Sequence, residues 1–303
     1  MTDQLYAPAG QCVPIVTLTS KVLAELRPWA AEELPGSEDQ LPLLGAAFCE
    51  AIVGPWATAE QLRLPARMVI WTYAFDDYIE REVTELADLD AFLDRCRAVI
   101  HTGRRDDGDP LLASLSSWQQ ALSELPGYPA LASLWEEKVD SVLRGHRYDW
   151  VVGAERERGN PPDAGVEEYL DHADSITLWM VHLPRWIAYG GDEVPKRLDV
   201  LAPALDDASV AVRLANDLAT IERERSEPGQ NNVLMYGVSQ DWVRTELANR
   251  MAAVEQRLAP LVAENFLPAV GLIRLTEWSV GIYVGNDMRD VTGTYQTDGR
   301  SGA

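Results

Sequence analysis

Apolar side chains recur along this chain mainly at the spacing of one helix face. Residues 89–100 place six of them at helical i, i+3, i+4, i+7 positions, namely Leu89, Phe92, Leu93, Cys96, Val99 and Ile100. Residues 242–261 nearly repeat this pattern, whereas the alternation typical of strands is almost absent. Gly and Pro residues separate the apolar runs, for example at 126–127 and 190–191. The pattern therefore predicts about ten helices packed in one all-α bundle, without an internal linker.

Length and charge narrow the classes of protein to which the chain can belong. Its 303 residues suffice for a deep core, and 26 Lys and Arg against 48 Asp and Glu give a net charge of −22. This acidity argues against nucleic acid and anionic membrane surfaces as partners. No apolar stretch approaches the roughly 18 residues of a membrane-spanning helix, and the first residues do not resemble a secretory signal. We therefore expect a cytoplasmic protein. Its three cysteines lack metal-ligand spacing, and we expect them to stay reduced.

The first cluster of candidate ligands closes an unusually apolar helix. Thr58 and Gln61 have capping-box spacing and predict its start, and the apolar run ends abruptly in the carboxylates Asp76, Asp77 and Glu80. Carboxylates three and four residues apart project from adjoining sectors of one helical turn, where they repel one another unless a cation neutralises them. Mg²⁺ prefers such oxygen ligands. The alternative is a solvated helix end, because an acidic chain often produces this string by chance.

A second polar cluster lies in another largely apolar helix. Asn216, Thr220 and Glu224 are each four residues apart, so they form one stripe roughly 12 Å long. An amide oxygen, a hydroxyl and a carboxylate on one stripe offer a chelate for a hard cation. Arg223 adds a fixed positive charge suited to phosphate oxygens. The alternative is a polar stripe facing solvent, although this string is rare by chance.

Together, at a separation of 216 − 76 = 140 residues, the two clusters resemble the metal-binding motifs of bacterial single-domain class I terpene synthases. The resemblance extends to residues 159–162, to 168–170 at the start of a helix that breaks over the active site, to 231–233, and to 285–295. It implies an all-α class I isoprenoid-synthase bundle with a central active-site cavity, and a homodimer. We expect one domain over residues 1–295, followed by a frayed tail over 296–303.

The activity that the resemblance implies is ionisation of a prenyl diphosphate to a carbocation, which cyclises as diphosphate is released. Three Mg²⁺ ions would assist, and Asp77 would belong to the catalytic residues. The implied metal ligands are Asp76, Glu80, Asn216, Thr220 and Glu224. Arg223 would bind the diphosphate. Aromatic faces stabilise positive charge, and the aromatic residues on the family's pocket-wall segments are Phe75, Trp179, Trp186, Trp278 and Tyr283.

Two positions depart from the family pattern. Ala173 stands where the family has an arginine that senses the diphosphate. Thr294 stands where it has the arginine of an Arg-Tyr pair, while Tyr295 is kept as a diphosphate-binding residue. Both changes remove charge-assisted donors to the diphosphate. His172 and Arg289 are the candidate substitutes, although a lone histidine on a helix is more often structural.

The substrate is less well determined than the reaction. The two missing arginines suggest a divergent branch and slightly favour geranylgeranyl diphosphate (C20) over farnesyl diphosphate (C15), the substrate of sesquiterpene synthases. Copalyl diphosphate is a third candidate, and the chain has no DxDD string with which it could make that compound itself. The second DDxxD motif of chain-elongating prenyltransferases and the Gly-rich phosphate loops are also absent from the sequence. A non-catalytic helical binding or scaffold protein is the alternative of a different class.

Overall fold

A computed structural model of the chain describes residues 9–34, 40–160 and 165–284. Over these ranges the chain forms helices and no strand, which confirms the all-α prediction. The α-helices are α1 (Ala9–Glu33), α2 (Gln40–Val53), α3 (Ala59–Arg81), α4 (Leu86–Thr102), α5 (Pro110–Ser123), α6 (Tyr128–Glu157), α7 (Val166–Asp171), α8 (Leu178–Tyr189), α9 (Leu198–Glu224), α10 (Gln240–Ala263) and α11 (Leu267–Tyr283). Short 3₁₀ helices are η2 (Ala173–Ile176), η3 (Pro195–Arg197) and η4 (Val233–Tyr236).

Several helix boundaries follow capping signals in the sequence. α3 begins at the expected capping box, in which the Gln61 N–H donates to the Thr58 hydroxyl oxygen at 3.2 Å and the Thr58 N–H donates to Gln61 Oε1 at 2.9 Å. Asp109 caps α5 by accepting two backbone N–H groups of its first turn. Gly103 ends α4 with a φ of 63°, a left-handed conformation that suits glycine.

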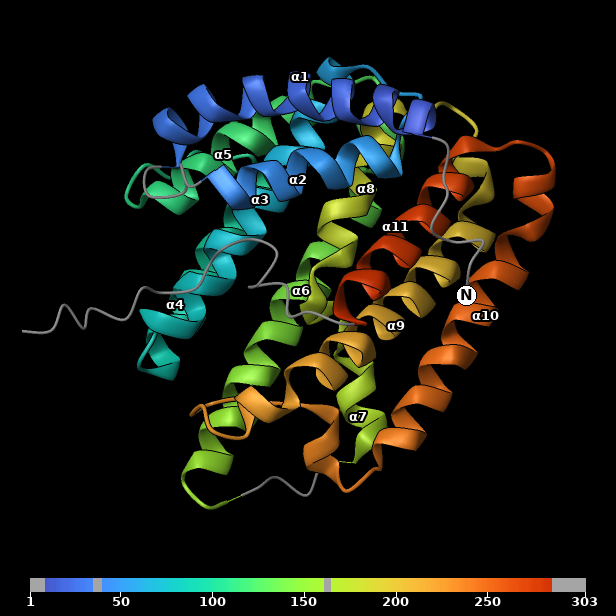
Figure 1. The fold of residues 1–303 in the computed structure, drawn as a ribbon. Helices are drawn as coiled ribbons and strands as arrows, with labels where there is room; N and C mark the ends of the chain where they lie inside the picture. The colour runs from blue at the N-terminus through green and yellow to red at the C-terminus, as the bar shows by residue number, and fades with distance from the viewer. Residues whose placement is uncertain (1–8, 35–39, 161–164, 285–303) are drawn as a thin grey trace, which may run out of the picture.

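The helices pack as a bundle with two helices laid across one end (Figure 1). α1 and α2 lie side by side across the top of the view, and both pack on α3. α9 packs against α10 and α11, which run beside it along the bundle. α8 contacts both α3 and α9. The helices that carry the two candidate motifs therefore share a neighbour.

Buried tryptophans join the helices of the core and satisfy their own polar atoms. The Trp71 indole N–H on α3 donates to the carbonyl oxygen of Leu111 on α5 at 2.8 Å. Trp135 on α6 donates in the same way to Gln119 Oε1 on α5 at 2.9 Å. Each indole thus combines a large apolar surface with a hydrogen bond, so it fixes one helix relative to another.

The segment between α7 and α8 breaks the helical path, as expected from residues 168–170 onwards. After η2, Thr177 has a φ of 61°, in the left-handed region that β-branched residues rarely adopt. The break packs tightly on Gly145 of α6, where a Cβ atom would lie 2.8 Å from the backbone nitrogen of Ser175. Glycine at this position therefore allows the broken segment to approach α6.

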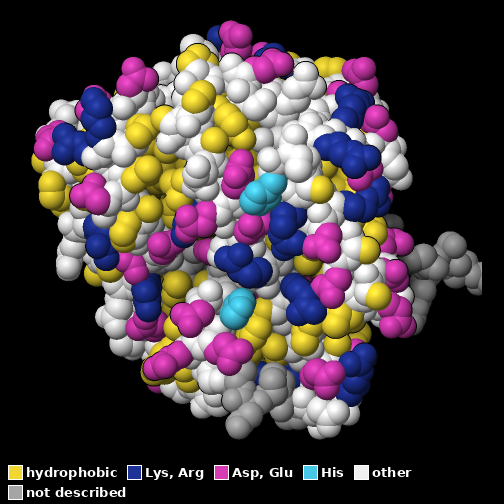
Figure 2. All heavy atoms as spheres, turned by 180° about the vertical axis from the view of Figure 1, so that it is seen from behind, with side chains coloured by type: hydrophobic (Ala, Val, Ile, Leu, Met, Phe, Trp, Pro, Cys, Tyr) yellow, Lys and Arg dark blue, Asp and Glu magenta, His cyan; other side chains and the backbone are white. Residues whose placement is uncertain are grey.

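The surface in Figure 2 carries both signs of charge, with basic and acidic side chains interspersed across the face shown. None of the described helices is long and apolar enough to cross a membrane. The tail expected over 296–303 lies outside the described residues, as does the segment 285–295 with Arg289, Thr294 and Tyr295.

Candidate active site

The first motif occupies the last turns of α3. Phe75 and Ile79 are buried in the core, whereas Asp76 and Glu80 are exposed. Asp77 is half-buried, and its Oδ1 lies 2.9 Å from the guanidinium of Arg81 one turn later. The helical period thus separates an apolar face from an acidic face. Asp76 and Glu80 lie one turn apart on that acidic face.

The second motif lies at the C-terminal end of α9. Thr220 is 1 % exposed and Glu224 is 8 % exposed, while Asn216 is half-buried. The Thr220 hydroxyl donates to the carbonyl oxygen of Asn216 at 2.9 Å, so its oxygen keeps lone pairs for a further partner. The burial argues against the alternative of a polar stripe facing solvent.

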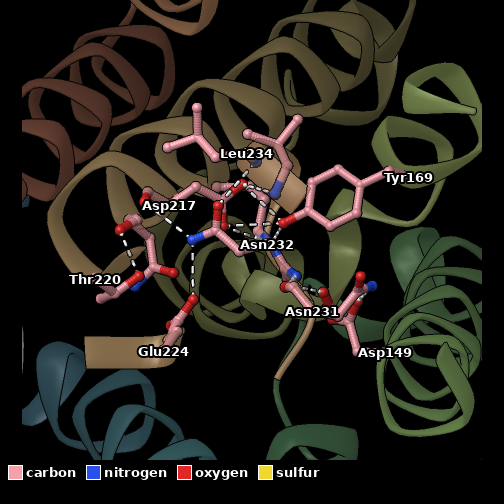
Figure 3. A network of polar contacts seen from close by, with 12 residues as sticks. Asp149, Tyr169, Asp217, Thr220, Glu224, Asn231, Asn232 and Leu234 are labelled. Atoms are coloured by element: carbon pink, nitrogen blue, oxygen red, sulfur yellow. Dashed lines mark hydrogen bonds and ion pairs between the residues drawn. The ribbon is translucent and has the colours of Figure 1, made fainter. Parts of the chain in front are cut away.

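A fully buried asparagine from the loop after α9 holds Glu224 (Figure 3). Asn232 Nδ2 donates to Glu224 Oε2 and to the carbonyl oxygen of Asp217, both at 2.9 Å. The Asn232 side-chain oxygen accepts the N–H of Leu234 at 3.0 Å and caps η4. The other Glu224 oxygen, Oε1, lies 3.7 Å from the guanidinium of Arg223. Asn232 therefore fixes one carboxylate oxygen of the motif and leaves the second beside a cation.

Asp217, next to the first residue of the motif, is 1 % exposed and ties α9 to α7 and η4. Its two carboxylate oxygens lie 2.7 and 2.9 Å from the Tyr169 hydroxyl, which donates to them. The N–H of Val233 donates to the same carboxylate at 3.3 Å. Burial raises the pKa of Asp217 to about 7, against the lowering effect of Arg213.

Arg213 gathers four segments of the chain around the second motif. From α9 its guanidinium donates to the Tyr169 hydroxyl on α7, to Asp149 on α6 at 2.8 Å, to the Ser175 hydroxyl on η2 and to the carbonyl oxygen of Asn231 at 2.9 Å. Burial alone would lower the pKa of Arg213, but the negative charge of Asp149 and its neighbours holds it well above the ordinary value. All three guanidinium nitrogens have protein partners, so Arg213 acts as a structural tie.

The sequence reasoning missed Arg213 and Asp149, and it gave Asp217 and Asn232 no role of their own. One local signal was present, because Arg213 and Asp217 are four residues apart on the motif helix, the spacing of a helical ion pair. The partners Asp149 and Asn231 lie 64 and 18 residues from Arg213 in sequence. No local pattern indicates such contacts.

The candidate diphosphate-binding residues within the described ranges are held by neighbours. The His172 ring stacks on Tyr148 with centroids 4.0 Å apart, and its Nδ1 lies 2.9 Å from the carbonyl oxygen of Glu168. Ala173 is buried beside it in η2. Arg223 forms an ion pair with Glu227. Binding of diphosphate by His172 or Arg223 stays a prediction.

Arg185, to which the sequence assigned no role, forms an enclosed ion pair with Glu50. Their side chains are 1 % and 0 % exposed, and Arg185 Nε donates to Glu50 Oε2 at 2.9 Å. Burial raises the pKa of Glu50, and the charge of Arg185 opposes this shift. The pair joins α8 to α2, and the Arg185 guanidinium has its partner inside the protein.

The aromatic residues expected as pocket walls lie at different depths. Phe75, Trp179 and Trp186 are buried in the core, whereas Trp278 and Tyr283 on α11 are half-buried. Burial suits core packing as well as contact with an enclosed hydrocarbon. Their contact with substrate therefore stays a prediction.

A cavity of about 210 Å³ opens among α4, α5 and α6, and its lining includes no residue of either motif. Within the described ranges, no three His, Cys, Asp or Glu side chains converge on a ready metal site. The second motif itself supplies one carboxylate beside an amide and a hydroxyl. A metal there would need further oxygens, from water, substrate or α3.

Comparison with known proteins identifies the family. Residues 67–253 match the family model for terpene synthase family 2, C-terminal metal binding, and this span includes both motifs. The chain is 48 % identical over 270 residues to ent-pimara-9(11),15-diene synthase of Streptomyces sp. (strain KO-3988), which covers 89 % of this chain and 91 % of the relative. Such identity over nearly the whole length of both proteins shows common family membership.

Solved structures share the fold at much lower identity. Linalool/nerolidol synthase of Streptomyces clavuligerus, in complex with 2-fluorogeranyl diphosphate, aligns with a TM-score of 0.65 and 17 % identity, covering 86 % of this chain and 98 % of that one. 2-Methylisoborneol synthase of Streptomyces coelicolor A3(2) aligns with a TM-score of 0.64 and 17 % identity, covering 89 % of this chain and 91 % of that one. These likenesses agree with the helical architecture and with the family match. The chain therefore belongs to terpene synthase family 2 and is a class I terpene cyclase that uses a divalent metal.

Proposed function

We propose that this chain is a Mg²⁺-dependent cyclase that ionises a C20 prenyl diphosphate, cyclises the carbocation and releases diphosphate. The observation that carries the proposal is the second motif, where the half-buried Asn216 and the buried Thr220 and Glu224 offer three kinds of oxygen donor on one helix. Burying a carboxylate costs stability unless it is well paired. Asn232 satisfies one oxygen of the buried Glu224, and the second oxygen, 3.7 Å from Arg223, keeps lone pairs for a metal ion, which favours the enzyme over the non-catalytic alternative.

The chemistry of the donors suits Mg²⁺. Thr220 and Glu224 keep unshared lone pairs beside their protein hydrogen bonds. Asp76 and Glu80 offer carboxylates on α3, and both motif helices pack on α8, which supports ligation of one ion cluster. Asp76, Glu80, Asn216, Thr220 and Glu224 would hold the three ions. When bound, the ions neutralise the departing diphosphate and so favour ionisation of the carbon–oxygen bond.

Cationic side chains of this chain would complete the diphosphate site. Arg223 would exchange its pairing with Glu227 for phosphate oxygens, since both pairings use the same guanidinium donors. His172, held at the end of α7, would supply a donor beside the position of the missing arginine. Arg289 and Tyr295 belong to the same proposed set.

The C20 chain length rests on the named relative. Ent-pimaradiene is a C20 hydrocarbon, and its synthase is 48 % identical to this chain. We propose geranylgeranyl diphosphate as the first substrate to test. Copalyl diphosphate, its bicyclic isomer, is the second, because this chain has no DxDD string and would receive that compound ready-made. Farnesyl diphosphate is the C15 alternative.

One experiment tests the proposal. The purified full chain is incubated with Mg²⁺ and each of these three diphosphates, and both diphosphate release and hydrocarbon products are measured. The variant Glu224→Ala is compared with Glu222→Ala, because Glu222 is an exposed carboxylate two residues away on the same helix. We expect a cyclic product from a C20 substrate, abolished by EDTA and by Glu224→Ala but kept in Glu222→Ala.

The alternatives predict other results. Turnover of farnesyl diphosphate alone would make the chain a sesquiterpene synthase, and no turnover of any diphosphate would favour the scaffold. Full activity of Glu224→Ala would remove Glu224 from the ligands. The homodimer implied by the resemblance stays a prediction, which light scattering of the purified chain measures.

A further inference from the structure

A buried histidine packs against the first motif helix with one ring nitrogen unpartnered among the described residues. His146 on α6 is 6 % exposed, and its Nε2 is buried without a hydrogen-bond partner in the described part of the chain. Its ring meets the ring of Phe75 edge to face, with centroids 4.9 Å apart. Phe75 directly precedes Asp76 on α3. Most buried polar atoms in proteins are hydrogen-bonded, so an orphaned nitrogen at this place needs an explanation.

The charges that act on His146 come from the network around the second motif. Burial lowers the pKa of His146 to about 4; the charge of Asp149 opposes this shift, and the charge of Arg213 adds to it. The imidazole is therefore neutral near pH 7 and carries a lone pair. Asp149 lies one turn along α6, and its negative charge would stabilise the His146 ring when the ring gains a proton.

Two other orphaned nitrogens have a simpler explanation. His182 Nε2 and Trp186 Nε1 are both buried without partners, and both residues line one cavity of about 10 Å³. That volume is about what a single water needs. His146 lines neither that cavity nor the one of about 210 Å³. Its ring contacts Phe75 on α3, and the charge of Arg213 on α9 acts on it.

We propose that His146 is the base that ends the carbocation cascade, a role that rests on the proposed cyclase function. In this step the C–H bond beside the cationic carbon breaks, and its electron pair becomes the π-bond of the alkene. The proton passes to the unprotonated nitrogen of the imidazole, so the positive charge moves from the carbocation to His146. The imidazolium then returns the proton to water when the product has left. A weak base suffices, because a carbocation is a far stronger acid than an imidazolium.

Two substitutions separate proton transfer from packing. His146→Gln keeps a polar side chain without a basic nitrogen, and His146→Phe keeps a ring of similar shape. The matched control is His182→Gln, which removes another buried histidine, 1 % exposed, whose pKa burial lowers well below its usual value. Each full-length protein is incubated with Mg²⁺ and geranylgeranyl or copalyl diphosphate. Diphosphate release reports ionisation, gas chromatography with mass spectrometry reports the products, and circular dichroism reports folding.

We expect folded His146 variants to release diphosphate within about threefold of the wild-type rate, while the main wild-type alkene falls about tenfold or more as a share of products. Double-bond isomers and alcohols should replace it, and His182→Gln should keep the wild-type ratio. Unchanged product ratios in both His146 variants would overturn the role of His146 and leave the cyclase standing. A wild-type chain that releases no diphosphate would overturn the cyclase, and with it this proposal.

Discussion

Asn232 donates its side-chain amide to Glu224 at 2.9 Å, from a position with no exposed surface, across a separation of eight residues. The same amide reaches the carbonyl oxygen of Asp217 on the preceding turns of α9. One asparagine thus orients the last proposed ligand and binds the loop after α9 to the motif helix. Partners behind a ligand set its geometry and commonly contribute to metal affinity.

Replacing Asn232 by Ala should weaken Mg²⁺ binding about 10- to 100-fold, because Glu224 loses the donor that orients it. The Mg²⁺ concentration for half-maximal diphosphate release measures the effect. Asn249→Ala is the control, since Asn249 is exposed on α10. Equal Mg²⁺ dependence in the two variants would show that the Asn232 bond does not support metal binding.

Replacing Arg213 by Gln should destabilise the fold by about 3–5 kcal/mol, because Asp149 loses the partner that balances its charge and the hydrogen bonds of the buried guanidinium to four segments are lost. Denaturant unfolding measures the free energy of unfolding. The control Arg225→Gln breaks a pair with Glu222 in which both side chains are exposed, so it should change stability by less than about 1 kcal/mol. Similar losses in both variants would contradict the role of Arg213 as a tie.

The pair of Glu50 and Arg185 offers a test with two opposite outcomes. Glu50→Gln leaves the enclosed guanidinium unbalanced and should cost about 3–5 kcal/mol of unfolding free energy. The double variant Glu50→Leu with Arg185→Met removes both charges and should recover most of that loss. Chemical denaturation of the three proteins checks this, and a double variant less stable than Glu50→Gln would refute it.

Stability should fall in acid partly through His146. The pKa of His146 is about 4 in the folded chain and about 6.5 in the unfolded chain. Its contribution to the free energy of unfolding is therefore fully present above pH 6.5 and is lost as pH falls through 4. The difference amounts to up to about 3 kcal/mol. Unfolding free energies of wild type and His146→Gln, measured from pH 7 to pH 4, should therefore converge or cross. A constant difference over that range would show that His146 is not buried in neutral form.

The parts of the structure that follow helical spacing could be predicted from the sequence, and the parts made by distant contacts could not. The start of α3 at Thr58 and the stripe of Asn216, Thr220 and Glu224 depend on residues three and four apart, which one helical turn brings together. Arg185 lay beyond prediction, because its partner Glu50 is 135 residues away on another helix. Such pairs become visible only when the helices are packed.

The burial of a side chain also depends on contacts between distant residues, so it could not be predicted from the sequence. The sequence placed acidic residues at the end of α3 and on α9 by identical arguments, yet Glu80 is exposed and Glu224 is buried. What separates them is the loop after α9, whose Asn232 covers the carboxylate. The spacing of residue types predicts on which face of a helix a side chain lies. Whether that face is buried depends on neighbours from elsewhere in the chain.

The network around Arg213 has a consequence for ligand recognition. Because this one guanidinium hydrogen-bonds to α6, α7, η2 and the loop after α9, we expect the wall that carries the second motif to be rigid before any ion arrives. Binding then incurs little loss of conformational entropy at that wall. Selectivity among diphosphates that share one head group must consequently arise at their hydrocarbon ends.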